Sequence, residues 1–99
     1  MASKIKDEKL DFLFEAILTL ETVEDCYSFF EDLCTVTELK SMSQRIVVAK
    51  MLSDGRVYSD IVKETGASTA TIGRVNKCLA YGSGGYKAAI EKLSETEDA

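Results

Sequence analysis

The chain has 99 residues, an apolar content of 45% and a formal net charge of −5 at pH 7. This length predicts one domain with a small core, which oligomerisation would help to complete. No apolar run is long enough for a bilayer and no leader is evident, so we expect a cytoplasmic protein without a membrane partner. The three cysteines are odd in number and not closely spaced, and histidine is absent, so neither disulfides nor a metal site are expected.

The first predicted element is a helix over residues 7–20, after a polar segment, residues 1–6, that we expect to be flexible. Its apolar stripe has helical spacing and consists of Leu10, Leu13, Phe14, Ile17 and Leu18. Phe12 and Leu20 lie off this stripe, so more than one face of the helix is apolar. Either the helix is intertwined with a second subunit, or neighbouring helices of its own chain bury it. The short chain favours the first explanation.

Two further helices are predicted, each starting at a threonine. Thr22 caps the first of them, and Thr35 begins a capping box in which Glu38 is the third residue of the next helix. The latter helix ends at the turn signal before Gly55. Its predicted apolar stripe consists of Leu39, Met42, Ile46, Ala49 and Leu52.

Residues 58–79 predict a helix-turn-helix. Gly66 suits the turn, because glycine takes a positive φ at no steric cost, and Ser68 or Thr69 can cap the second helix. Small, hydroxylated or basic residues form one face of this second helix, namely Thr69, Ala70, Thr71, Gly73, Arg74 and Lys77. A helix-turn-helix presents such a face to the major groove of DNA. The inward stripe is Ile72, Val75 and Leu79.

The charges are unevenly distributed along the chain. Residues 1–39 hold 3 basic and 10 acidic side chains, a net charge of −7, whereas residues 40–92 hold 9 basic and 4 acidic ones, a net charge of +5. The predicted helix-turn-helix therefore lies in the positive part, as expected for a phosphate-facing surface. Small domains often have uneven charge, so the absence of any acidic residue over residues 68–79 is the more specific observation.

A glycine-rich stretch, residues 82–86, breaks the second helix of the motif and precedes a last short helix over residues 86–93. Its spacing does not match a phosphate-binding loop, and no strand precedes it. We expect the acidic tail, residues 94–99, to be flexible. The predicted class is all-α, with about six helices in a single domain over residues 1–99.

Enzyme chemistry has little support in this sequence. Histidine is absent, and the paired acids are adjacent in sequence, so that they point to different sides of a helix. We therefore predict no catalytic residue. Besides DNA binding, two other functions stay open: a protein-interaction module of the same fold that uses its acidic half, residues 7–38, and a small-molecule-responsive regulator.

The segment GASTATIGRVNKCL at residues 66–79 resembles the recognition-helix region of the tryptophan repressor (TrpR) family. Together with SQR at 43–45, AKML at 49–52 and YGSGGY at 81–86, it is most similar to the YerC/YecD-like branch. The resemblance implies an intertwined homodimer of six-helix subunits. It also implies a transcriptional regulator, acting as a repressor, that binds a pseudo-palindromic site in double-stranded DNA.

The resemblance also implies which residues bind DNA. The matching contact positions are Ser68, Thr69, Ala70, Thr71 and Gly73, with Arg74 and Lys77 adding backbone contacts. Tyr58 and Ser59 match the start of the first helix of the motif, where the family contacts phosphate. Neither residue is basic here, so a weaker phosphate contribution is expected from them.

The ligand pocket implied by the resemblance consists of Thr35, Arg45, Arg74 and Cys78. Two residues depart from the repressor, since Val75 replaces a glycine beside the ligand and Cys78 replaces a serine. A branched side chain fills part of an indole-sized space, and a thiol is a weaker acceptor than a hydroxyl. We therefore predict no cofactor, and in particular that tryptophan is not the co-repressor. Arg74 is then expected in a phosphate contact or a salt bridge.

Overall fold

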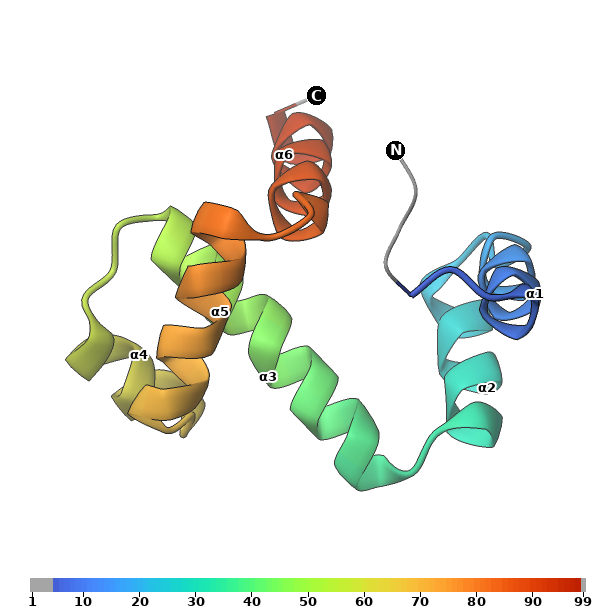
Figure 1. Ribbon diagram of the computed structural model, residues 1–99, viewed down its shortest axis with the longest axis horizontal. Helices are drawn as coiled ribbons and strands as arrows, with labels where there is room; N and C mark the ends of the chain where they lie inside the picture. The colour runs from blue at the N-terminus through green and yellow to red at the C-terminus, as the bar shows by residue number, and fades with distance from the viewer. Residues whose placement is uncertain (1–4, 99) are drawn as a thin grey trace. The chain divides into compact units, whose positions relative to one another are not determined.

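The computed structural model describes residues 5–98, and every regular element in this part of the chain is an α-helix (Figure 1). The helices are α1 (Glu8–Ile17), α2 (Val23–Leu33), α3 (Val36–Ser53), α4 (Tyr58–Thr65), α5 (Thr69–Tyr81) and α6 (Gly85–Asp98). The predicted all-α class with six helices is confirmed. The expected flexibility of residues 1–4 and 99 concerns positions outside the described residues. No helix in the described part is both long and apolar enough to cross a membrane.

The backbone contacts divide the chain into two units, Met1–Val36 and Thr37–Ala99. In the first unit, both helices begin at a side-chain cap. The Asp7 carboxylate accepts a hydrogen bond from the Leu10 amide (3.2 Å), and the Thr22 hydroxyl accepts one from the Asp25 amide (3.0 Å). These caps satisfy amides that the first turn leaves unpaired.

The first helix ends earlier than predicted. Its last residue is Ile17, and the amides of Thr19 and Leu20 bond to carbonyls three residues back, at Ala16 and Ile17. The Thr19 hydroxyl also donates to the Ala16 carbonyl, at 2.6 Å. This tighter pattern ends the α-helix in a turn, so the predicted end at Leu20 is wrong.

The N-terminal unit exposes much of its apolar surface. Neither α1 nor α2 contains a buried residue. Phe12 is 74% exposed and Leu18 is 83% exposed. Of the two residues off the predicted stripe, Phe12 is thus left uncovered by the chain itself, whereas Leu20 is half-buried.

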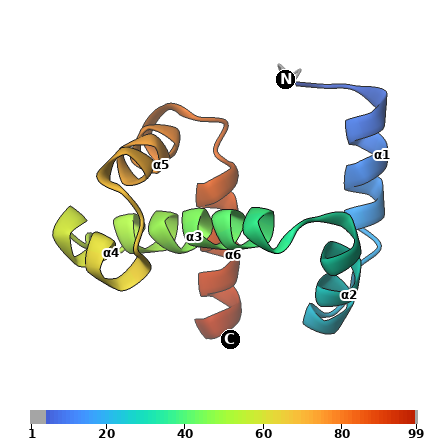
Figure 2. The same ribbon diagram turned by 90° about the horizontal axis from the view of Figure 1, so that it is seen from below.

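The second unit contains the hydrophobic core, which consists of Val48, Ala49, Met51, Ile61, Ala67, Ile72, Val75 and Ile90. Helix α5 contacts both α4 and α6, and it lies with α4 at the C-terminal end of α3 (Figure 1, Figure 2). Only this end of α3 is buried, whereas Met42, nearer its start, is 38% exposed. Along the predicted stripe, Ala49 is buried and Leu39, Ile46 and Leu52 are half-buried, so burial by the chain itself is greatest near the C-terminal end of α3.

The last helix is longer than predicted. It extends to Asp98 rather than ending at Leu93, and the Thr96 hydroxyl donates to the Lys92 carbonyl at 3.0 Å. At its other end, the corner before α6 depends on Gly82, since a Cβ there would collide with the carbonyl oxygen of Cys78. A residue with a side chain at this corner would push the end of α5 away from its observed path.

Replacing Ile61 by alanine should lower the free energy of unfolding by about 2–5 kcal/mol, because its fully buried side chain would leave a cavity between α4 and its neighbours. Val57, just before α4, is 59% exposed, and its replacement by alanine should cost no more than about 0.5 kcal/mol. Urea unfolding at one protein concentration measures both. Equal losses in the two variants would contradict this description of the core.

Candidate nucleic-acid interface

Helices α4 and α5 form the predicted helix-turn-helix, joined by residues 66–68. Gly66 closes α4 in the left-handed region, with φ of 74°, and its amide donates to the Val62 carbonyl. The Ser68 hydroxyl oxygen accepts a hydrogen bond from the Thr71 amide and the Ser68 hydroxyl donates to Thr71 Oγ1, both at 3.1 Å. Of the two possible caps, Ser68 is thus the one used, and Thr69 is left as the first residue of α5.

Helix α5 has a buried face and an exposed one. Ile72 is fully buried and Val75 is 2% exposed, which confirms that this stripe points inward. Of the other predicted residues, Thr69, Ala70, Arg74 and Lys77 are exposed, and Thr71 and Gly73 are half-buried. These six residues are called the α5 face below.

The α5 face is open to a close approach. A Cβ built at Gly73 would meet no other atom within 4 Å, so the protein's own packing does not require glycine there. No acidic residue occurs in α5, while Arg74 and Lys77 lie on the exposed side. The face therefore combines small side chains, hydroxyls and positive charge, which suits a contact with a polyanion.

Tyr58 and Ser59 lie in the first turn of α4 and are both exposed. The residue that precedes them, Val57, provides no side-chain hydrogen bond to cap the helix. The positive end of the helix dipole is thus open on this side, although the Asp60 carboxylate in the same turn offsets part of it.

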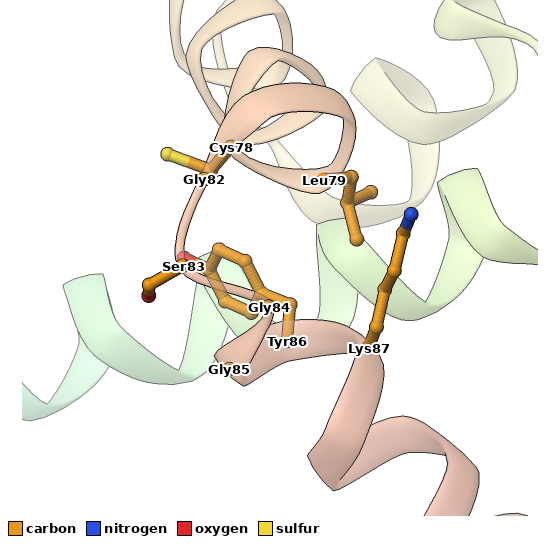
Figure 3. A pocket seen from close by; sticks show the side chains of 8 residues that line it. All are labelled: Cys78, Leu79, Gly82, Ser83, Gly84, Gly85, Tyr86 and Lys87. Carbon is orange, nitrogen blue, oxygen red and sulfur yellow. The ribbon is translucent and has the colours of Figure 1, made fainter. Parts of the chain in front are cut away.

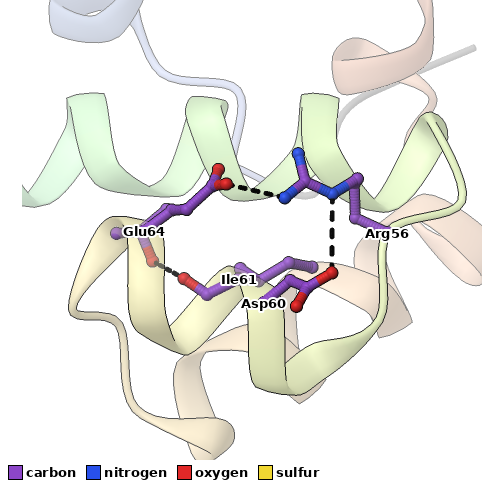
Figure 4. A network of polar contacts seen from close by, with 5 residues as sticks. Arg56, Asp60, Ile61 and Glu64 are labelled. Carbon is purple, nitrogen blue, oxygen red and sulfur yellow. Dashed lines mark hydrogen bonds and ion pairs between the residues drawn. The ribbon is translucent and has the colours of Figure 1, made fainter.

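Arg56, in the loop before α4, forms an ion-pair network that the sequence analysis missed (Figure 4). Its Nη2 lies 2.7 Å from Glu64 Oε1, and its Nε lies 3.8 Å from Asp60 Oδ2. The hydrogen bond and charge of Glu64 raise the pKa of Arg56 above its ordinary value. The guanidinium is therefore paired with two carboxylates of α4. The spacing of Asp60, four residues after Arg56, was a signal for part of this network.

A cavity of about 290 Å³ lies within the second unit, between α3, α5 and α6. Its lining residues are Ser41, Gln44, Arg45, Thr71, Arg74, Val75, Cys78 and Tyr86. Three of the four predicted ligand residues, Arg45, Arg74 and Cys78, thus come together. Thr35 is not among the lining residues and belongs to the N-terminal unit.

Two arginines, Arg45 and Arg74, line the cavity. Arg45 Nη1 donates to Ser41 Oγ at 2.9 Å, which holds this side chain along α3. Val75 also lines the space, as expected for a residue that narrows it. The arrangement can hold a small anion better than an apolar ring, because its lining is rich in donors.

A second hollow of about 330 Å³ lies at the corner between α5 and α6 (Figure 3). It is lined by Cys78, Leu79, Gly82, Ser83, Gly84, Gly85, Tyr86 and Lys87. Figure 3 shows the glycine corner with Tyr86 and Lys87 on its α6 side. Over the described residues, no cluster of three or more histidines, cysteines or acids could hold a metal ion.

Comparison with known proteins places this geometry in a family. The family model described as the Trp repressor protein matches residues 8–94. The chain belongs to the Trp repressor family. This is a family of regulators rather than of enzymes, which confirms the prediction that the chain is not an enzyme. The six-helix TrpR-like fold is confirmed as well.

Several relatives in the family are similar over nearly the whole chain. The uncharacterized protein YerC of Bacillus subtilis (strain 168) is 51% identical over 94 residues, which are 95% of this chain and 90% of YerC. A crystal structure described as that of a candidate Trp repressor from Staphylococcus aureus has a TM-score of 0.88 and 50% identity, over 92% of this chain and 91% of the other. A TrpR-like protein from Eubacterium eligens ATCC 27750 has a TM-score of 0.88 and 52% identity, over 92% and 94%.

Ser68→Ala should lower the free energy of unfolding by about 1 kcal/mol, because the Thr71 amide loses its cap. Ser68→Asp should keep most of the stability, since aspartate caps a helix as well as serine does. Thermal unfolding of the two variants measures the difference. If Ser68→Asp is as unstable as Ser68→Ala, the cap is not what Ser68 contributes.

Proposed function

We propose that this chain is a sequence-specific transcriptional regulator of the Trp repressor family, acting as a repressor, that binds double-stranded DNA as a homodimer. The observation that carries the proposal is the α5 face, which is small, hydroxylated and basic on an acidic chain. Family membership supports a DNA-binding regulator. Because its proposed target is double-stranded DNA, we expect the protein in the cytoplasm.

The α5 face divides into residues suited to bases and residues suited to phosphates. Thr69, Ala70, Thr71 and Gly73 are small and start the helix, so they allow the backbone to approach base edges in the major groove. Arg74 and Lys77 lie further along the helix and suit phosphate contacts. Tyr58 and Ser59 would add hydroxyl contacts from α4.

The N-terminal unit supports the homodimer. A helix pair that buries no residue while exposing Phe12, Leu18 and Tyr27 needs a partner surface. A second copy offers the same apolar surface, as a twofold interface requires. The two helix-turn-helix motifs of the dimer would then lie roughly 34 Å apart, which is one turn of DNA, on a pseudo-palindromic site.

Lys77→Ala should weaken binding similarly on all duplexes and lower the slope of log affinity against log salt by about 1 per subunit. Arg56→Ala is the matched control, because Arg56 already pairs with Glu64 and Asp60 and should leave the slope unchanged. Fluorescence polarisation over a salt series measures both. An unchanged slope in Lys77→Ala would remove the phosphate assignment.

Thr71→Val should instead alter sequence preference, because it replaces a hydroxyl at the start of α5 by a methyl group. Selection of bound duplexes from a random pool, for the wild type and the variant, measures this. The same selected site with both proteins would show that Thr71 does not read bases. Absence of binding by the wild type to any duplex at low salt would favour the interaction module that uses the acidic half.

Leu18→Glu should yield a monomer, because the glutamate would place a charge in the proposed apolar interface. In the single chain, Leu18 is 83% exposed. Analytical ultracentrifugation over a concentration series measures the change. Thr19→Glu, at the exposed neighbouring position, is the control and should leave the assembly intact. A wild type that is monomeric at every concentration would exclude the homodimer.

The cavity beside α5 supports a second candidate, a regulator that responds to a small molecule other than tryptophan. Arg45 and Arg74 offer it two guanidinium groups, and Val75 narrows it. Titration calorimetry with tryptophan should give no saturable heat. A saturable heat would overturn the role assigned to Val75.

A further inference from the structure

The turn of the helix-turn-helix receives a hydrogen bond from outside the motif. Gln44 Nε2, on α3, donates to the Thr65 carbonyl oxygen at 3.2 Å, across 21 residues of sequence. Thr65 is the last residue of α4, and its carbonyl is among those that helical bonding leaves without a partner. Because a carbonyl can only accept, the amide nitrogen of Gln44 must be the atom that faces it.

Thr65 is also the centre of the local turn. Its hydroxyl donates to the Ile61 carbonyl at 2.6 Å, and its Oγ1 accepts from the Ala67 amide at 3.1 Å. The next residue, Gly66, makes the left-handed reversal that sets the direction of α5. A shift of the Thr65 carbonyl would therefore move the start of α5.

We propose that Gln44 is a positioning residue that fixes the orientation of the α5 face by holding the Thr65 carbonyl from α3. Three observations carry this assignment. The bond joins two helices, it meets an acceptor that α4 leaves unpaired, and Gln44 borders the 290 Å³ cavity. Because Gln44 borders open space, its neighbours do not enclose the side chain fully, and the hydrogen bond to Thr65 adds a directional contact.

This assignment rests on the proposed DNA binding, but it also has a test that needs no DNA. Gln44→Met keeps the length of the side chain and removes the donor, whereas Gln44→Lys restores a donor. Ser43→Ala is the control, because it removes a hydroxyl that bonds only within α3, to the Lys40 carbonyl. A role in packing alone would be kept by methionine.

In the free protein, the Ala67 amide should exchange its hydrogen about three to ten times faster in Gln44→Met than in the wild type, as expected for one lost neutral hydrogen bond. The Ile90 amide on α6 should be unaffected. Gln44→Lys should restore most of the protection. If Gln44→Met exchanges at Ala67 as slowly as Ser43→Ala does, the assignment is overturned.

With DNA, Gln44→Met should lower the ratio of affinities for a selected duplex and a scrambled one by about three- to tenfold, with an unchanged salt slope. Gln44→Lys should recover the ratio. Faster Ala67 exchange with an unchanged ratio would overturn the positioning role. If the wild type binds no duplex, the proposed function fails, and the exchange measurement still decides whether Gln44 holds the turn.

Discussion

The burial of three side chains, Val48, Ile61 and Ile72, is the constraint on which the rest of the second unit depends. They come from α3, α4 and α5, and all are fully buried. Each contributes roughly 1.5–3 kcal/mol through removal of apolar surface from water. Once Ile72 and Val75 point inward, the helical period alone places Thr69, Ala70, Arg74 and Lys77 on the opposite side. The α5 face thus follows from the core.

The features that depend on neighbouring residues could be predicted from the sequence. The Ser68 cap, the reversal at Gly66 and the inward stripe of α5 each need only a few adjacent positions. The ends of α1 and α6 differ from the predicted ones, because a helix end is decided by small differences among competing hydrogen bonds. The buried half of α3 was not predictable either, since Met42 and Ala49 share a stripe and differ only in what packs on them.

The residues of the candidate site could be predicted from the sequence. Which side chains form hydrogen bonds or ion pairs with one another could not. A charge count treats every cation alike, whereas the structure separates Arg56, which α4 neutralises, from Lys77 on the α5 face. Likewise, nothing in the sequence marked Gln44, because its partner Thr65 lies 21 residues away. Contacts between residues so far apart in sequence depend on the fold itself and leave no local sequence pattern.

The two units also differ in how they are stabilised. The second unit buries its own core, whereas the helices of the first bury no residue. Helices as short as α1 and α2 are marginal in water without tertiary packing. If a second copy supplies that packing, as we propose, the folding of the N-terminal unit is linked to subunit concentration. The same contacts would then raise the affinity for DNA, since the two helix-turn-helix motifs of one dimer engage adjacent half-sites with a high effective concentration. The apolar surface of α1 would in this way contribute to DNA affinity without touching DNA.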